Sequence, residues 1–191
     1  MHLNDNMPSE SADILIGTRI FLVGFMGSGK THWGKIWADT HNLDFYNLDS
    51  IVEESEGMSI NDIFHMKGEP YFRASETRAL HLFAFQQNFL LSCGGGAPCF
   101  DNNMGWINNH GISIYLKPAI ATIVTRLKDE ASHRPLIKDI APSELSSFIE
   151  MKLIEREPYY LKANLVLPEE KINMESLDGL LNLENPNHSQ T

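Results

Sequence analysis

Residues 24–31 read GFMGSGKT and lie between the apolar run IFLV at 20–23 and the segment HWGKIWA at 32–38. The stretch matches GxxxxGK(S/T), which is typical of a phosphate-binding loop when it joins a strand to a helix. The apolar run has the composition of a buried strand, and the segment after the loop reads as a helix. This phosphate loop (24–31) therefore predicts a nucleotide-binding α/β domain.

Each residue type in the phosphate loop has a physical role. Its glycines permit the backbone angles that turn successive N–H groups toward phosphate oxygens, and the following helix directs its positive end to the same point. Lys30 is expected to reach the β- and γ-phosphates, and the Thr31 hydroxyl is expected to contact Mg²⁺. Trp33 and Trp37 are expected in the core or at an interface rather than against the nucleotide. The predicted nucleotide-binding residues of this stretch are Gly27, Ser28, Gly29, Lys30, Thr31 and His32.

Four further apolar runs follow the first one along the chain, with helix-like stretches between them. Short apolar runs that alternate with helices are typical of a parallel sheet covered on both faces. The predicted order is β-α-β-α-α-β-α-β-α-α-β, an α/β three-layer sandwich with a five-stranded parallel sheet. The predicted strands are RIFLVGF at 19–25, DFYNL at 44–48, FLLSC at 89–93, ISIYL at 112–116 and NLVLP at 164–168.

The composition limits the partners of the chain. Its 191 residues include 15 Lys plus Arg and 25 Asp plus Glu, which gives a formal net charge of −10. This excess of acid disfavours binding to nucleic acid or to anionic membranes, and no apolar run approaches the roughly 20 residues of a membrane-spanning helix. The two cysteines have no disulfide-framework or zinc spacing, and the N-terminal residues lack the features of a secretory signal. We therefore expect a cytoplasmic protein that binds small molecules. A monomer is also expected, although nothing in the composition specifies the oligomeric state.

The length of the chain suits one domain with polar ends. Residues 1–17 and 176–191 are rich in Asn and Ser, and are expected to be a flexible N-terminal arm and a flexible C-terminal tail. The single domain then spans 18–175. Within it, residues 129–139 read DEASHRPLIKD, with a proline and five charges between two predicted helices. This composition predicts a mobile lid at about 129–140.

Polar residues and glycines follow the second and third predicted strands, near the edge where an open α/β sheet binds ligands. Asp49, two residues after Asn47, is placed either to accept a proton from an attacking hydroxyl or to cap the next helix. Arg73 and Glu76 share one helical face, as part of a site or as a surface ion pair. Glycines 94–96 either let the backbone approach a small ligand or form a plain flexible turn.

The order and spacing of these segments resemble shikimate kinase. The resemblance implies a P-loop fold like that of nucleoside-monophosphate kinases, with substrate-binding helices at about 49–79. It also implies transfer of the γ-phosphoryl group of ATP to the 3-hydroxyl of shikimate, in aromatic amino-acid biosynthesis. Besides the phosphate loop and Gly34, the matching segments are FYNLD at 45–49, SINDIFHMKGEPYFRASE at 59–76, CGGGA at 93–97, IYLK at 114–117, RL at 126–127, HRPLI at 133–137 and EREPYY at 155–160.

The resemblance implies a role for each matching residue. Asp49 matches the acidic residue that contacts the shikimate hydroxyls. Arg73 and Arg156 match the arginines that hold its carboxylate, which suits the fork of a guanidinium. Arg134 matches the arginine that neutralises charge on the transferring phosphoryl group, and Arg126 matches a residue bordering the adenine, so both belong to the predicted nucleotide site. The implied catalytic residues are Lys30, Asp49 and Arg134, and the implied substrate-binding glycines are Gly94, Gly95 and Gly96.

One position departs from the family pattern. The family usually has FxDxD on the second strand, and its first Asp helps to hold Mg²⁺ through water, whereas this chain has Asn47 there. An amide oxygen can accept a hydrogen bond from a metal-bound water, but it brings no charge to offset the ion. We therefore expect either a lower Mg²⁺ affinity or a role shared with the phosphates and Thr31.

Two other functions remain open at the level of sequence. A gluconate kinase or a nucleotide kinase would share the phosphate loop and the fold. The former should lack the FR…GGG…RPL set, and the latter needs a base-recognition pocket for which the sequence shows no signal. The second alternative, a catalytically silent nucleotide-binding module, would explain Asn47 as the first sign of decay.

Overall fold

The computed structural model describes residues 17–130, 136–138 and 140–178. In this part of the chain the helices and strands follow the predicted order. The strands are β1 (Arg19–Val23), β2 (Asp44–Asn47), β3 (Phe89–Ser92), β4 (Ile112–Lys117) and β5 (Leu165–Pro168). The helices are α1 (Lys30–Thr40), α2 (Leu48–Glu56), α3 (Ile60–His81), α4 (Asn103–His110), α5 (Ile120–Glu130) and α6 (Leu145–Tyr160).

The strands form one parallel sheet in the order β2-β3-β1-β4-β5, which confirms the predicted five-stranded parallel sheet. β1 lies at its centre, with Ile20 beside Leu90 of β3 on one side and beside Ile112 of β4 on the other. Because β2 and β3 lie on one side of β1 and β4 and β5 on the other, the strand order changes direction there. Ligands bind beyond the carboxyl ends of the strands at such a point, and the phosphate loop begins at this end of β1.

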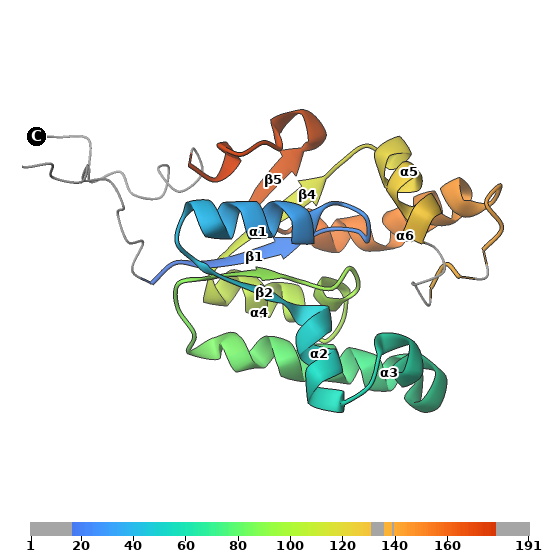
Figure 1. The fold of residues 1–191 in the computed structure, drawn as a ribbon, viewed down its shortest axis with the longest axis horizontal. Coiled ribbons are helices and arrows are strands. Elements are labelled where there is room, and N and C mark those ends of the chain that lie inside the picture. Colours follow the sequence, from blue (N-terminus) through green and yellow to red (C-terminus); the bar gives the residue numbers. More distant parts are fainter. Residues whose placement is uncertain (1–16, 131–135, 139, 179–191) are drawn as a thin grey trace, which may run out of the picture.

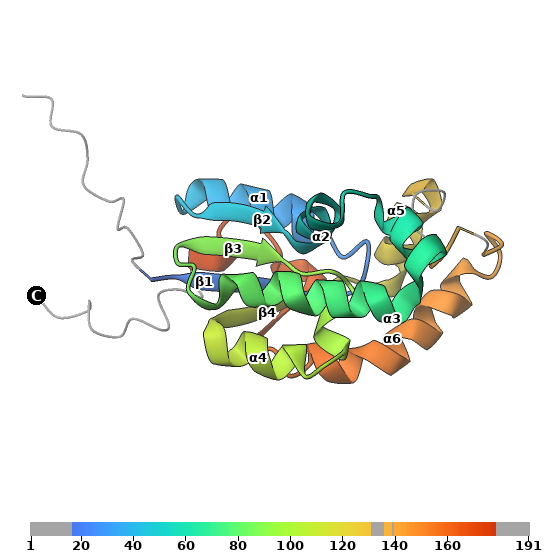
Figure 2. The ribbon, with the colours of Figure 1, turned by 90° about the horizontal axis from the view of Figure 1, so that it is seen from below.

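Helices cover both faces of the sheet (Figures 1 and 2), with α1 on one face and α3 and α4 on the other. The side chains of β1 alternate between the two layers, as the two-residue period of a strand requires. Phe21 and Val23 belong to the core under α3, α4 and α6, whereas Ile20 and Leu22 pack with Trp37 of α1. The three-layer sandwich is therefore the observed architecture.

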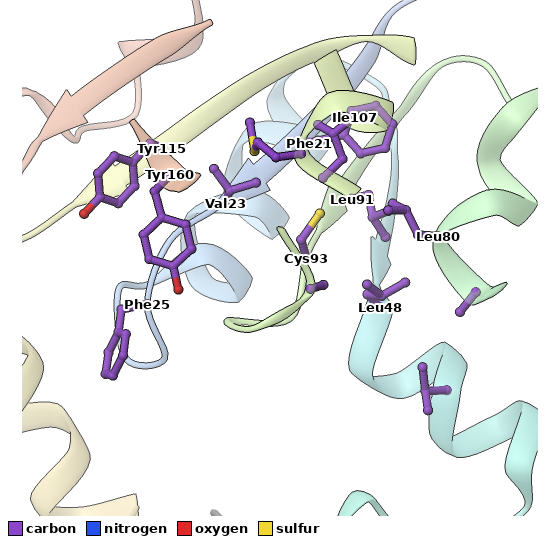
Figure 3. Close-up of a cluster of buried hydrophobic side chains, with 14 of the residues drawn as sticks. Phe21, Val23, Phe25, Leu48, Leu80, Leu91, Cys93, Ile107, Tyr115 and Tyr160 are labelled. Carbon is purple, nitrogen blue, oxygen red and sulfur yellow. The ribbon is translucent and has the colours of Figure 1, made fainter. Parts of the chain in front are cut away.

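The larger core lies directly behind the carboxyl ends of the strands. Figure 3 shows Phe21 and Val23 of β1 together with Leu91 of β3, Tyr115 of β4 and Tyr160 of α6. Each of these side chains is at most 2% exposed. Burial of a large apolar side chain contributes about 1.5–3 kcal/mol, so this cluster holds the strand ends and α6 in fixed positions beneath the loops.

The α3 helix contains a bend that positions its second half. Ser59 caps its start by accepting a hydrogen bond from the backbone N–H of Asp62 at 3.1 Å. Gly68 has φ 81° and ψ 166°, which interrupts the helix, and Pro70 lies in the first turn after the interruption. Proline is well tolerated in a first helical turn because no intrahelical donor is lost there. The second half of α3, which carries Arg73, therefore has its own direction.

The packed chain continues past the boundary expected at residue 175. Leu177 is fully buried in the core on the α1 side, and the Asp178 carboxylate lies 2.9 Å from Nε2 of His41. The predicted start of the C-terminal tail at residue 176 is therefore too early. The sequence could not indicate this, because a single leucine in a polar stretch carries no local signal that it packs against a distant helix. No helix in the described part of the chain combines the length and apolar character needed to cross a membrane.

The end of the expected lid also packs against the domain. Ile137 is fully buried in the larger core, and Leu136 packs against the same cluster. Residues 131–135 and 139 lie outside the described residues.

Candidate active site

The phosphate loop encloses the ammonium group of Lys30. Its Nζ donates hydrogen bonds to the carbonyl oxygens of Gly24 and Phe25 at 2.8 and 2.9 Å, and the residue is only 8% exposed. Gly29 has φ 93°, in the left-handed region that favours glycine, and α1 begins at the next residue. The helix N-terminus and the lysine therefore converge on one point, as binding of a phosphate chain requires.

Two cavities meet at Asp49. The first, which we call the donor cavity, has a volume of about 540 Å³ and lies against the phosphate loop. The second, the acceptor cavity, has a volume of about 370 Å³ and lies between α2, α3 and α6. Met26, Asp49 and Gly95 line both cavities. A group bound in one cavity can therefore reach a group bound in the other beside the Asp49 carboxylate.

Asp49 is directed to this junction because another residue caps the helix. The Asn47 side chain is the N-cap of α2, and its Oδ1 accepts hydrogen bonds from the backbone N–H groups of Asp49 and Ser50 at 2.9 and 3.4 Å. The alternative that Asp49 serves as the cap is therefore wrong. The Nδ2 of Asn47 donates to the Thr31 hydroxyl at 3.2 Å, so the amide presents its NH₂ group, and not its oxygen, to Thr31.

Arg73 lies in the wall of the acceptor cavity between two carboxylates. Its Nη1 donates to Glu76 Oε2 at 2.5 Å, while Nη2 and Nε donate to Glu69 Oε1 at 2.7 and 3.1 Å. Arg73 is 6% exposed and Glu76 is 1% exposed, so their pair is buried and the surface-pair alternative is wrong. Glu69, whose side chain is 44% exposed, occupies the Nε and Nη2 edge of the guanidinium, which is one of the edges that can bind a planar carboxylate.

Burial alters the titration of Glu76. Loss of solvation raises its pKa to about 7, and the Asp49 carboxylate acts in the same direction, while the Arg73 guanidinium opposes both. The Glu76 carboxyl group therefore changes its charge near neutral pH. It does so beside Asp49, which lines the acceptor cavity.

The three glycines after β3 have neighbours that leave little room for side chains. A Cβ on Gly94 would overlap the carboxylate oxygens of Glu76 and Asp49, and one on Gly96 would overlap the Arg73 guanidinium. The Tyr160 hydroxyl donates a hydrogen bond to the carbonyl of Gly95. The turn is thus held by charged groups and by α6, which is a more specific role than that of a plain flexible connection.

Arg156 enters the acceptor cavity from α6, opposite α3. It is 7% exposed, and its guanidinium carbon lies 5.7 Å from the centre of the Phe25 ring. With Arg73 it brings two guanidinium groups to one cavity, a donor set that suits an anionic ligand with a planar carboxylate.

The other end of the donor cavity lies beside α5. Arg126 donates from Nη1 to the Gly27 carbonyl at 3.0 Å, and His32 and Trp33 line the same cavity. Arg134 lies outside the described residues, so its predicted position at this site stays a prediction.

Comparisons with known proteins identify the family. The family model described as shikimate kinase matches residues 26–181. A shikimate kinase of Flavobacterium psychrophilum is 42% identical over 144 residues, which cover 74% of this chain and 84% of that protein. A solved structure of shikimate kinase from Acinetobacter baumannii in complex with shikimate has a TM-score of 0.80 at 27% identity, and the match covers 93% of this chain and 97% of that one. The chain belongs to the shikimate kinase family.

This membership confirms the resemblance drawn from the sequence motifs, and the P-loop kinase fold with it. A gluconokinase from Sinorhizobium meliloti has a TM-score of 0.55 at 19% identity, over 88% of this chain and 95% of that one. That likeness shows the fold alone. A shared fold is compatible with many functions, so the substrate must be argued from the site.

Two residues of this shikimate kinase site were missed by sequence reasoning. Glu69 carries a signal that could have found it, because its spacing of four residues from Arg73 allows an ion pair on a helix. Trp33 packs against the core on the α1 side, as expected, but it also lines the donor cavity, which the sequence did not indicate. Its four-residue spacing from Trp37 predicts that both share a helix face but does not say where that face ends at a cavity.

Proposed function

We propose that the protein is a shikimate kinase that transfers the γ-phosphoryl group of ATP to the 3-hydroxyl of shikimate and releases ADP. Family membership supports this reaction, and the Acinetobacter baumannii relative was solved with shikimate. The observation that carries the proposal is the meeting of the donor and acceptor cavities at Asp49. A phosphate chain on Lys30 and an acceptor between Arg73 and Arg156 would face each other at that carboxylate.

The acceptor cavity matches the chemistry of shikimate, a small ring with one carboxylate and three hydroxyls. Arg73 and Arg156 can hold the carboxylate by charge-assisted hydrogen bonds. The cavity is also lined by Phe64, Phe72 and Met26, which offer apolar surface to the ring. We propose that the substrate carboxylate replaces Glu69 at the exposed edge of Arg73.

The transfer needs one proton acceptor and a means of neutralising charge. As the 3-hydroxyl oxygen bonds to the γ-phosphorus, its proton passes to Asp49, and the bond from the γ-phosphorus to the bridging oxygen breaks to leave ADP. Lys30 neutralises the phosphates from within the loop. The resemblance assigns Arg134 to the same task, as an arginine finger within one chain.

We propose that Mg²⁺ enters the site with ATP. The described residues contain no group of three or more His, Cys, Asp or Glu side chains that could hold a metal. Thr31 offers one neutral hydroxyl at the donor cavity, which fits an ion that takes most of its ligands from phosphates and water. When bound, the ion neutralises part of the phosphate charge.

A coupled ADP-release assay tests the proposed function. Shikimate, gluconate and a set of nucleoside monophosphates are compared at equal concentrations, with a preparation of the Lys30→Ala variant as the control for contaminating kinases. We expect rapid release with shikimate only. Equal turnover of gluconate would favour the related kinase, and ATP binding without turnover of any acceptor would favour the silent module.

We further propose that the protein acts as a monomer in the cytoplasm. Both cysteines, Cys93 and Cys99, are free thiols, and such thiols persist in a reducing compartment. Light scattering after size-exclusion chromatography tests the oligomeric state, and a mass near twice the 21.6 kDa of one chain would contradict it.

A further inference from the structure

The two ends of the donor cavity differ in chemistry. One end carries Asp49 and Gly95 and joins the acceptor cavity, so the terminal phosphate must lie there. His32, Trp33 and Arg126 line the donor cavity but not the acceptor cavity, and Trp33 and Arg126 border the loop at Gly29, so we take them as the other end. Because the phosphates occupy the loop between these ends, the nucleoside must leave the loop on the side of Trp33 and Arg126.

Trp33 presents its pyrrole edge to the phosphate loop. A point placed as a Cβ on Gly29 would lie 3.2 Å from Trp33 Cδ1, 3.7 Å from Trp33 Nε1 and 3.2 Å from Arg126 Nη1. The indole edge and the guanidinium therefore border the same part of the loop. Within the described residues, Trp33 Nε1 makes no hydrogen bond, whereas the Trp37 indole donates to the Asn173 carbonyl at 2.9 Å.

The position of Trp33 is held by its neighbours. Its ring stacks on that of Trp37 with the centroids 5.8 Å apart and an angle of 28° between the planes, and the His32 ring contacts it edge-on at 5.2 Å. Trp37 is fully buried, so it provides a fixed support, while Trp33 is half-buried at the cavity. A rigid aromatic ring with a polar N–H is well suited to bind a nucleoside, because it offers a stacking face and a donor at low entropic cost.

We propose that Trp33 contacts the adenosine moiety of the bound nucleotide, beside Arg126, as a binding residue of the donor site. This proposal rests on the proposed function only in requiring that the protein bind ATP and ADP. In this proposal Trp33 binds the nucleotide, whereas its neighbour Trp37 only packs in the core.

Calorimetric titration with two probes tests whether Trp33 contacts the nucleoside or only stabilises the phosphate loop. ADP carries the nucleoside, whereas inorganic tripolyphosphate engages the loop alone. For Trp33→Leu we expect ADP affinity to fall about tenfold, because an aromatic contact to a base is lost, while tripolyphosphate affinity stays within about twofold. Trp33→Phe keeps an aromatic ring but removes the N–H. Its ADP affinity should therefore lie between that of Trp33→Leu and that of the unchanged protein.

Tryptophan fluorescence adds a second readout, since the chain has three tryptophans. Trp106 is the matched control because it lies in α4 and stacks on His110 at 3.9 Å, on the other side of the sheet. The emission change on ADP binding should persist in Trp106→Phe and be largely lost in Trp33→Leu.

Unchanged ADP affinity in both Trp33 variants would overturn the proposal, and so would an equal loss of ADP and tripolyphosphate affinity. If the unchanged protein bound no ADP, the proposed function itself would fail. The two failures are therefore distinguishable.

Discussion

The Asn47 side chain links the end of β2 to the phosphate loop, donating from Nδ2 to Thr31 Oγ1 across 3.2 Å. Its orientation is set by the other end of the amide, where Oδ1 accepts from the Asp49 backbone N–H at 2.9 Å. A backbone N–H can only donate, so the oxygen must face the helix and the NH₂ must face Thr31. The residue that departs from the family pattern thus keeps a structural role and places no negative charge beside Thr31.

Asn47→Asp should tighten Mg²⁺ binding. One carboxylate oxygen would still cap α2, while the other would bring negative charge to the position of the present NH₂. We expect the Mg²⁺ concentration needed for half-maximal ADP binding to fall severalfold, roughly threefold or more, with an unchanged shikimate KM. ADP titrations at a series of Mg²⁺ concentrations measure this directly, and the same Mg²⁺ dependence in both proteins would show that position 47 does not act on the ion.

Lys30→Ala should abolish turnover. The buried ammonium is a fixed positive charge held within the phosphate loop, where the nucleotide phosphates are expected to bind. Lys35→Ala is the matched control, since Lys35 is an exposed residue of the same helix. Steady-state ADP release should be lost in the first variant and retained in the second. Retention of most of the rate by Lys30→Ala would refute the phosphate-loop assignment.

Arg73→Ala and Arg134→Ala should fail in different ways. In the proposed reaction Arg73 would hold a carboxylate whose charge does not change, so its loss should mainly raise the shikimate KM. Arg134, as the implied arginine finger, should act in the transition state, so its loss should lower kcat by roughly a hundredfold or more and leave shikimate affinity within a few-fold. Shikimate titration and kcat measurement on both variants decide the matter. A proportional loss of binding and rate in both would contradict this division.

Glu69→Gln should strengthen shikimate binding. The Glu69 carboxylate occupies the edge of Arg73 that we propose for the substrate carboxylate, and the pair is partly exposed. Removing the charge should lower the shikimate Kd by roughly two- to fivefold, the range of an exposed ion pair. Glu155→Gln, which affects an exposed pair with Lys152 on α6, is the control. Weaker binding in Glu69→Gln would mean that Glu69 positions Arg73 and does not compete with the substrate.

Stability should depend on pH through Glu76. Its pKa is raised from 4.5 to about 7 in the folded protein, chiefly by burial. The folded state therefore binds more protons than the unfolded state between these values, and this group lowers the free energy of unfolding as pH rises from 4.5 to about 7. Urea denaturation measures the free energy of unfolding of the unchanged protein and of Glu76→Gln. As pH rises across this window, the unchanged protein should lose stability relative to the variant. A constant difference would show that Glu76 does not titrate there.

The local motifs of the sequence predict most of the fold and much of the site. The glycines, lysine and threonine of residues 24–31 form a local motif, whose predicted role depends only on neighbouring residues. The apolar runs that alternate with helices predict the strands and their order along the chain. Asp49, Arg73 and Arg156 were therefore predicted as site residues from spacing and resemblance, and the structure brings all three to one cavity.

Contacts between distant segments were decided by the tertiary structure. Leu177 packs on the α1 side of the sheet, the Asn47 amide turns its NH₂ to Thr31, and Trp33 lies at the end of a helix face that opens onto the donor cavity. The sequence by itself predicted which residues would carry the proposed chemistry, because that prediction depends on residue type and local spacing. Which atom of each residue faces a ligand depends on neighbours that are remote along the chain, so only the packed fold could decide it.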